Sequence, residues 1–301
     1  MSFLDHMRIF TRVAELSSFT QAADHLGLPK ASVSTAVQQL ENSLGVRLLH
    51  RTTRKVTLTQ DGQAFYERSK DALADMDELQ TMFQTQAAHT LKGRVRIDMS
   101  TVIARDAVLP RLAELLASHP QLEVEVSSTE RRVDLIREGF DCVVRAGKVF
   151  EPGLIARPIG ELRMVNCVSP HYLTVHGVPL SIDDLPRHRL VHYVAILGGK
   201  PDGFEYVRDG QDYAVAMTGQ VTVNNALAYQ AACVAGLGLI QAPVVGLRDL
   251  LARGQLVEVL PRFQARPMPL SLVYANRRNL SVRVRVVMDW LMGVLRDYIK
   301  A

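Results

Sequence analysis

The side chains best suited to chemistry near the N-terminus lie on one face of a predicted helix, residues 30–44. At the helical period, the other face is apolar and carries, within about 60° of one another, Val33, Val37, Leu40 and Leu44. The polar face carries short, uncharged residues, namely Ala31, Ser34, Thr35, Gln38 and Asn42. Short uncharged side chains let a helix approach base edges and hydrogen-bond to them. This face therefore predicts contact with the bases of DNA.

Positive charge gathers just after this helix. The stretch 47–60 has no carboxylate but contains Arg47, Arg51, Arg54 and Lys55. Apolar residues on both sides of the basic tip predict two short strands, so Arg51, Arg54 and Lys55 would form a wing that contacts phosphates or the minor groove. Lys30, at the start of the preceding helix, is expected to lie near the sugar-phosphate backbone of the DNA. The alternative is a solvated charged surface without a partner.

Further candidate binding residues lie at the carboxyl ends of predicted strands after residue 90. They are polar or aromatic and comprise Ser100, Thr101, Ser128, Arg145, His192, Tyr193, Asn224 and Asn225. Ligands of open α/β sheets bind beyond the carboxyl ends of the strands. Helices expected after Thr101 and Asn224 would direct their positive ends there, which favours a small carboxylate or another anion. The alternative is that Ser100, Thr101 and Asn224 only cap helices and that Arg145 only forms a salt bridge.

Catalytic and metal-binding patterns are missing from the sequence. It has no GxSxG, no phosphate-binding loop and no paired metal-ligand motif, and Gly236-x-Gly238 follows a predicted helix, which makes it a weak dinucleotide signal. The three cysteines, Cys142, Cys167 and Cys233, are far apart and are expected to be buried thiols in a reducing compartment. We therefore expect no metal, no cofactor and no enzymatic activity.

The elements that position the polar helix face are two preceding helices. Residues 3–16 show helical spacing, and Thr20 is predicted to cap a second helix, 21–26, and to offer its backbone N–H to a phosphate. Gly27 is expected to end that helix, and the third helix follows. Two helices joined by a tight turn that contains glycine predict a helix-turn-helix.

Residues 61–88 predict one long helix with an acidic outer face. Apolar residues at a spacing of three and four form a seam made of Phe65, Ala72, Met76, Leu79 and Phe83. The seam favours pairing with the same helix of a second chain. The alternative is that it packs on its own domain.

The rest of the chain alternates predicted strands and helices, among them a helix at 131–138, and this alternation predicts parallel α/β sheets in two lobes. The length of 301 residues with 48% apolar composition fits about two domains. Residues 213–247 carry no charge, but scattered Asn, Gln and Pro favour a buried strand–helix–strand unit over a membrane span. With no signal peptide in the sequence, we expect a soluble cytoplasmic protein.

The first 60 residues resemble the winged helix-turn-helix of LysR-type transcriptional regulators. The resemblance rests on Phe19-Thr20-Gln21-Ala22-Ala23, Ser32-Val33-Ser34, Gln39-Leu40-Glu41, Leu44-Gly45, Leu48-Leu49, Leu58-Thr59 and Gly62. It extends over the whole chain through Val133-Asp134-Leu135-Ile136, Arg145-x-Gly147 and Gly236-x-Gly238. The sequence departs from the family at Thr35, where many members have Arg, and at Lys30-Ala31, so an operator sequence does not carry over.

The resemblance implies an α+β fold: a winged helix-turn-helix DNA-binding domain (1–60), a linker and dimerisation helix (61–90) and an effector-binding domain (91–301) similar to periplasmic binding proteins. One lobe would comprise 91–163 and 268–301, the other 164–267. The implied function is a bacterial regulator that binds an inverted-repeat operator in double-stranded DNA and responds to a small-molecule effector between the lobes. The resemblance also implies homodimers, usually assembled into homotetramers. The alternatives are a small-molecule-binding protein without gene control and an enzyme with an appended DNA-binding module.

Overall fold

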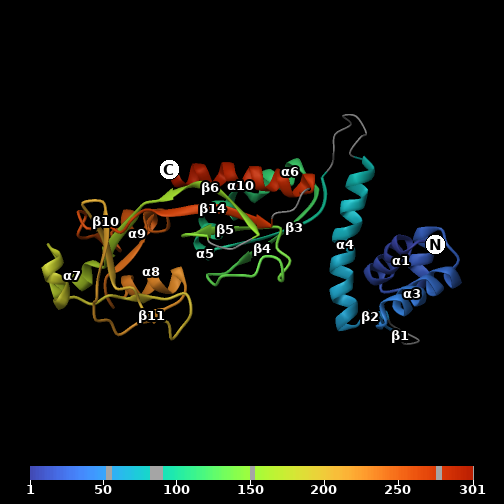
Figure 1. The fold of residues 1–301 in the computed structure, drawn as a ribbon, viewed down its shortest axis with the longest axis horizontal. Coiled ribbons are helices and arrows are strands. Elements are labelled where there is room, and N and C mark those ends of the chain that lie inside the picture. The colour runs from blue at the N-terminus through green and yellow to red at the C-terminus, as the bar shows by residue number, and fades with distance from the viewer. Residues whose placement is uncertain (52–55, 82–90, 150–152, 276–279, 301) are drawn as a thin grey trace. The chain divides into compact units, whose positions relative to one another are not determined.

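The computed structural model describes residues 1–51, 56–81, 91–149, 153–275 and 280–300. The chain divides into two compact units, Met1–Arg94 and Val95–Ala301, and each is described by itself. Figure 1 shows the elements of both.

Three helices and a two-stranded wing build the first unit. The helices are α1 (Phe3–Leu16), α2 (Phe19–Leu26) and α3 (Lys30–Leu44). The bounds predicted for the third helix are confirmed, and Val33, Val37 and Leu40 are completely buried in the core of this unit. The wing pairs β1 (Leu49–Arg51) antiparallel with β2 (Val56–Leu58).

The start of α2 differs from the prediction. Its cap is Ser18, whose Oγ accepts the backbone N–H of Gln21 at 3.3 Å, and Thr20 lies inside the first turn. The prediction that Thr20 caps this helix is therefore wrong. The reason is that Ser18 has the extended backbone of a cap residue, so that Phe19 already begins the helix. Gly27 ends α2 with φ +64°, as predicted.

The long helix α4 (Gln60–Thr81) follows the wing directly. Residues 82–90, over which the prediction extends this helix, lie outside the described residues. Thr59 joins wing and helix, since its Oγ1 donates to the Arg47 carbonyl at 2.7 Å and accepts the Gly62 N–H at 2.8 Å. The first turn of α4 thereby closes against the chain segment that enters the wing.

A five-stranded sheet forms the first part of the second unit, in the order β4-β3-β5-β14-β6. Its strands are β3 (Lys92–Met99), β4 (Gln121–Ser128), β5 (Cys142–Ala146), β6 (Leu154–Leu162) and β14 (Met268–Ala275). In Figure 1, α6 (Leu112–Ser118) and α10 (Val282–Lys300) run along this sheet. Their apolar residues share one core with β3, β5 and β14.

Shorter sheets form the second part of this unit. Strand β7 (Met164–Val168) lies between β12 (Ile240–Pro243) and β13 (Val257–Glu258). Two further pairs are β8 (His192–Tyr193) with β11 (Thr222–Val223), and the hairpin of β9 (Phe204–Arg208) with β10 (Gln211–Val215), which the sequence pattern does not predict. The chain crosses between the two parts twice, between β6 and β7 and between β13 and β14.

The sheets are mixed, so the prediction of parallel sheets is wrong in part. Strands β3 and β5 are parallel, but β14 is antiparallel to both β5 and β6, and β12 and β13 are antiparallel to β7. The reason is the second crossing, because β14 enters the first sheet from the second part of the unit and not through a helical crossover.

The segment after β3 is one continuous helical run with changes of pitch: α5 (Thr101–Ile103), a π-helix (Ala104–Val108), a 3-10 turn (Leu109–Arg111) and then α6. The second part carries α7 (Pro170–His176), α8 (Ala226–Val234) and α9 (Arg248–Ala252), with 3-10 turns at Ile182–Arg187 and Val244–Gly246. None of the described helices combines the length and apolarity needed to cross a bilayer.

The helix predicted at 131–138 does not form. Residues 131–134 have no helix or strand, and residues 135–139 form a turn. The Arg145 guanidinium donates to the carbonyls of Arg131 and Val133 at 3.2 and 3.3 Å, and Arg131 forms an ion pair with Glu138. The two carbonyls that Arg145 binds are ones that a helix at 131–138 would use for its own backbone bonds.

Candidate functional site

The solvent-facing side of α3 carries the predicted base-contacting residues. Lys30, Ala31, Thr35 and Gln38 are exposed and Ser34 is half-buried, whereas the opposite side of the helix is in the core. Thr20 is exposed in the first turn of α2, at the positive end of that helix. The structure thus brings the uncharged small residues of α3 to one accessible surface.

Glu41 connects α3 to the wing, a role that the sequence pattern does not reveal. Its Oε1 accepts the backbone N–H groups of Leu48 and Leu49 at 2.9 and 3.1 Å. Leu48 and Leu49 are themselves buried, so their N–H groups need a partner within the protein. Arg54 and Lys55, predicted at the wing tip, lie outside the described residues, and Arg51 is described only as part of β1.

The predicted dimerisation residues have different surroundings on α4. Phe65 and Ala72 pack against the core of their own unit, and the Phe65 ring lies 5.5 Å from that of Phe10. Both remain partly exposed, as does Met76. For Leu79 only the helical backbone is described, and Phe83 lies outside the described residues. Pairing of these residues with a second chain stays a prediction.

A cavity of about 350 Å³ lies between the two parts of the second unit. Three of the eight predicted effector residues line it, namely Ser100, Arg145 and Tyr193. The other five, which are not among its lining residues, are Thr101, Ser128, His192, Asn224 and Asn225. Ser100 and Asn225 are helix caps, since they accept the N–H groups of Ile103 and Ala228 at 3.4 and 2.8 Å. A role for the eight residues in binding stays a prediction.

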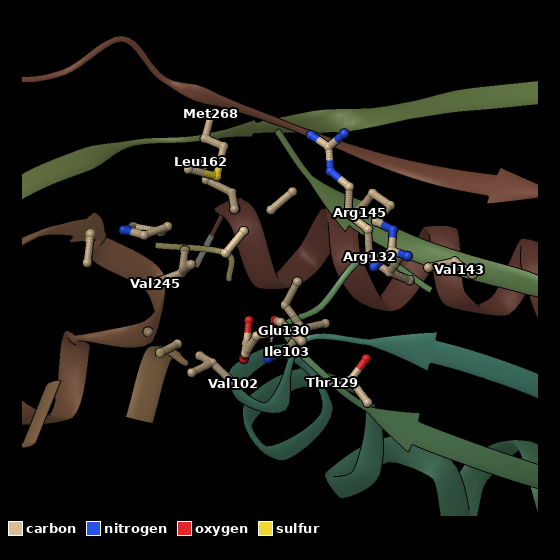
Figure 2. Close-up of a pocket in the computed structure, with 18 of the residues that line it drawn as sticks. Val102, Ile103, Thr129, Glu130, Arg132, Val143, Arg145, Leu162, Val245 and Met268 are labelled. Atoms are coloured by element: carbon tan, nitrogen blue, oxygen red, sulfur yellow. Dashed lines mark hydrogen bonds between the residues drawn. The ribbon is translucent and has the colours of Figure 1, made fainter. Parts of the chain in front are cut away.

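The wall of the cavity is mainly aliphatic and comes from both parts of the unit. In Figure 2, Leu162 and Met268 face Val102, Ile103 and Glu130 across the cavity. Tyr193 and Tyr229 add an aromatic corner, with their rings 5.4 Å apart and edge to face. Such a mixture of apolar surface with a few polar groups is typical of small-molecule sites.

Glu130 lies where the sequence predicts the anionic group of an effector. Its Oε1 accepts the Thr101 N–H at 3.1 Å, and the Ala226 N–H and the Thr101 side chain also favour the charged form of the carboxylate. These donors are the first residues of α5 and α8, from the two different parts of the unit. Burial raises the pKa of the Glu130 carboxyl, and the N–H donors of Thr101 and Ala226 act in the opposite direction. The N-terminal ends of α5 and α8 therefore already face a carboxylate of the protein itself, that of Glu130.

Arg145 is held by the buried carboxylate of Asp98, which does not line the cavity. Asp98 is completely buried and lies 3.6 Å from Nη1 of Arg145, and it accepts the hydroxyls of Ser127 and Thr129 at 2.7 and 3.0 Å. Burial raises the pKa of the Asp98 carboxyl, while the two hydroxyls and Arg145 lower it. The guanidinium of Arg145 also holds the Arg131 and Val133 carbonyls, which flank Arg132. Arg145 therefore both lines the cavity and holds in place the chain segment around Arg132 that forms part of its wall.

Arg132 and Lys148 line the same cavity and were not predicted as site residues. Both are exposed, and neither forms an ion pair with a residue of the described part of the chain. No local pattern marks them, because a basic residue in a loop is usually a solvated charge.

The described residues contain few other groups suited to nucleophilic or metal chemistry. All three cysteines are free and buried, as predicted, and burial raises the pKa of the Cys167 thiol to about 12. Such thiols are poor nucleophiles at neutral pH. Within the part of the chain that the structure describes, no group of three or more His, Cys, Asp or Glu residues could hold a metal ion.

A winged helix-turn-helix joined to an α/β unit with an internal small-molecule cavity defines the class of transcription regulators that carry a ligand-binding domain. The chain belongs to the LysR family of these regulators. Residues 4–63 match the family model described as bacterial regulatory helix-turn-helix protein, lysR family, and residues 88–296 match the LysR substrate binding domain.

Similar proteins match this chain along nearly all of their own length. The HTH-type transcriptional regulator YhjC of Escherichia coli K12, named as uncharacterized, is 48% identical over 99% of this chain and 100% of its own. An HTH-type transcriptional repressor of Pseudomonas aeruginosa UCBPP-PA14 is 35% identical over 99% of this chain and 93% of its own. The structure of CrgA, a LysR-type regulator from Neisseria meningitidis, has a TM-score of 0.60 and 26% identity, covering 96% of this chain and 97% of its own.

Proposed function

We propose that this LysR-type regulator binds an inverted-repeat operator with α3 in the major groove, and that a small anionic molecule in the cavity controls its activity. The observation that carries the DNA part is the division of α3 into two faces. Val33, Val37 and Leu40 are buried, while Thr35 and Gln38 are exposed and short enough for base contact. Regulation, and not turnover of a substrate, is the function that we infer.

The contacts around α3 support this docking. Thr20 and Lys30 stand at the starts of α2 and α3, where helix ends and positive charge favour phosphate. The Glu41 bonds to Leu48 and Leu49 tie the wing to α3, so that both would approach the DNA as one rigid element. Arg51, Arg54 and Lys55 are proposed to contact phosphates or the minor groove.

We further propose that α4 helices of two chains pair, which places two copies of α3 on one face of the DNA. Half-sites read by such a dimer are about 34–36 Å apart or multiples of this distance. Assembly of dimers into tetramers is proposed from family membership alone. Replacing Leu79 by Glu would put a charge in the seam, and light scattering should then show dissociation. An unchanged oligomer would show that the seam lies elsewhere.

For the effector, we propose that the two parts of the second unit are lobes, 91–163 with 268–301 and 164–267. The cavity lined by residues of both would hold the molecule, and its binding would change the spacing of the lobes. Arg132, Arg145 and Lys148 against the single carboxylate of Glu130 favour an anion in the cavity.

A gel shift tests the proposal. The full-length protein is incubated with duplexes from the region upstream of its own gene, with unrelated DNA of equal length as competitor. We expect a specific complex whose footprint covers an inverted repeat. If unrelated DNA competes equally at every salt concentration, sequence-specific binding is refuted, since the affinity that remains is that of phosphate contacts alone.

A further inference from the structure

The cavity wall restricts the body of any ligand. Most of its lining side chains are aliphatic, among them Val102, Ile103, Leu162, Met164, Val245 and Met268. A ligand with several hydroxyl or amide groups would lose hydration there without regaining hydrogen bonds. The wall therefore favours a hydrocarbon or aromatic body.

The charged lining residues differ in what they still offer to a ligand. Arg145 already binds Asp98 and two carbonyls. Arg132 and Lys148 have no ion pair with any described residue, and Arg145 fixes the backbone on both sides of Arg132. Figure 2 shows Arg132 and Arg145 on the same wall. Two cations near one apolar cavity suit a single anionic group.

Glu130 restricts which further charged groups a ligand in the cavity can carry. The Thr101 N–H already donates to its carboxylate, and the Ala226 N–H and the Thr101 side chain also stabilise the charge of this carboxylate. Little acceptor capacity remains for an ammonium group of a ligand, because a carboxylate offers about four lone-pair sites. Its negative charge nevertheless lies on the cavity wall and repels a second carboxylate.

We propose that the cavity binds an apolar monocarboxylate, with its carboxylate at Arg132 and Lys148 and its hydrocarbon body against the aliphatic wall, and that Glu130 excludes dicarboxylates. The inference rests on the proposed function of the cavity as the effector site. It names the class of effector and the residue that selects it. The Glu130 carboxylate already lies at the N-terminal ends of α5 and α8. The carboxylate of the ligand therefore binds at Arg132 and Lys148 and not at these helix ends.

The experiment compares probes that share one body and differ in charge. Hexanoate, adipate, 1-hexanol and hexylamine form one series, and benzoate, terephthalate and benzyl alcohol form a second. Binding to the full-length protein is measured by calorimetry at neutral pH, up to about 10 mM ligand, which covers weak dissociation constants. We expect the monocarboxylate of at least one series to bind about tenfold more tightly than its dicarboxylate and its neutral analogue, a difference of about 1.4 kcal/mol.

Substitutions separate the binding of the carboxylate by Arg132 and Lys148 from the exclusion of dicarboxylates by Glu130. Glu130→Gln keeps the shape of the side chain and removes its charge, so it should improve dicarboxylate binding about tenfold and change monocarboxylate binding less than about threefold. Arg132→Ala and Lys148→Ala should each weaken monocarboxylate binding. Arg137→Ala is the matched control, because Arg137 is an exposed arginine of the same segment that does not line the cavity.

Three results would overturn the proposal: equal binding of monocarboxylate and neutral analogue, selectivity unchanged in Glu130→Gln, or no binding by any of the carboxylates. If Glu130→Gln fails to fold, the selectivity of the wild-type protein between mono- and dicarboxylate decides instead. Gel shifts on the same samples keep the outcomes distinguishable, because loss of operator binding with carboxylate selectivity intact would count against the proposed function only.

Discussion

Gly62 of α4 lies directly against the backbone of Leu48. A Cβ on Gly62 would stand 1.9 Å from the Leu48 carbonyl oxygen, far inside contact distance. That carbonyl also accepts the N–H of Thr59, so it is fixed where the wing begins. The close approach therefore sets how α4 joins the wing, and only glycine allows it.

Replacing Gly62 by Ala should destabilise the first unit by about 1–3 kcal/mol, because the backbone must shift to admit the methyl group. Denaturant unfolding of the full-length protein measures this. Gly293→Ala is the control, since Gly293 lies in α10 with no atom near its would-be Cβ, and the change there should stabilise by up to about 1 kcal/mol. Equal effects of the two variants would rule out the steric explanation.

Gln38→Ala should relax the base preference of the protein. A bidentate contact from Gln to a base is worth about 1–3 kcal/mol of discrimination, so this much selectivity should be lost at one operator position. Competition binding with single-base operator variants gives the measurement. Gln39→Ala is the matched control, because Gln39 is an exposed glutamine of the same helix rotated by about 100°. If Gln39→Ala changes the preference and Gln38→Ala does not, α3 docks through a different face.

Arg145→Ala should destabilise the second unit in a pH-dependent way. It leaves the buried Asp98 carboxylate without its cation, which costs about 3 kcal/mol when Asp98 is ionised. Burial already raises the pKa of Asp98, so its contribution to stability is present below the ordinary pKa of 3.8 and is lost as pH rises through the folded-state pKa. The variant should raise that pKa further.

Unfolding curves between about pH 3 and pH 7 test this, because the penalty of Arg145→Ala should grow with pH. Adding Asp98→Asn to Arg145→Ala should restore part of the loss at neutral pH, since no buried charge then remains. A penalty that is constant with pH would show that Arg145 acts through its carbonyl contacts and not through Asp98.

Glu138 should show the opposite pH dependence. The Arg131 guanidinium lowers the pKa of the Glu138 carboxyl to about 2. A lowered pKa means that stability is present above the ordinary value of 4.5 and is lost as pH falls toward 2. Glu138→Gln should therefore be less stable than wild type at neutral pH, and the difference should shrink on acidification. Arg131→Gln should have the same effect, and the double variant should lose no more, because both replace one pair. Additive losses would contradict this pairing.

The sequence by itself determined the features that depend on local periodicity and on single backbone positions. The two faces of α3, its bounds, the glycine stop at Gly27 and the buried cysteines all follow from residue types and spacing along the chain. Of the polar residues predicted at strand ends, Ser100, Arg145 and Tyr193 line the cavity, and their role in binding stays a prediction. The cap of α2 was misplaced because Ser18 and Thr20 are both good cap residues, and the choice depends on backbone angles.

Only the tertiary structure decided which group meets which. Glu130 and Thr101 are 29 residues apart and Ala226 is further still, so no spacing in the sequence shows that one carboxylate lies near both helix starts. The same holds for Asp98 under Arg145 and for Glu41 at the wing. The direction of β14 likewise depended on where the chain crosses back between the two parts of the unit. Local propensity acts over a few residues, whereas burial and charge pairing act between segments that only folding brings together.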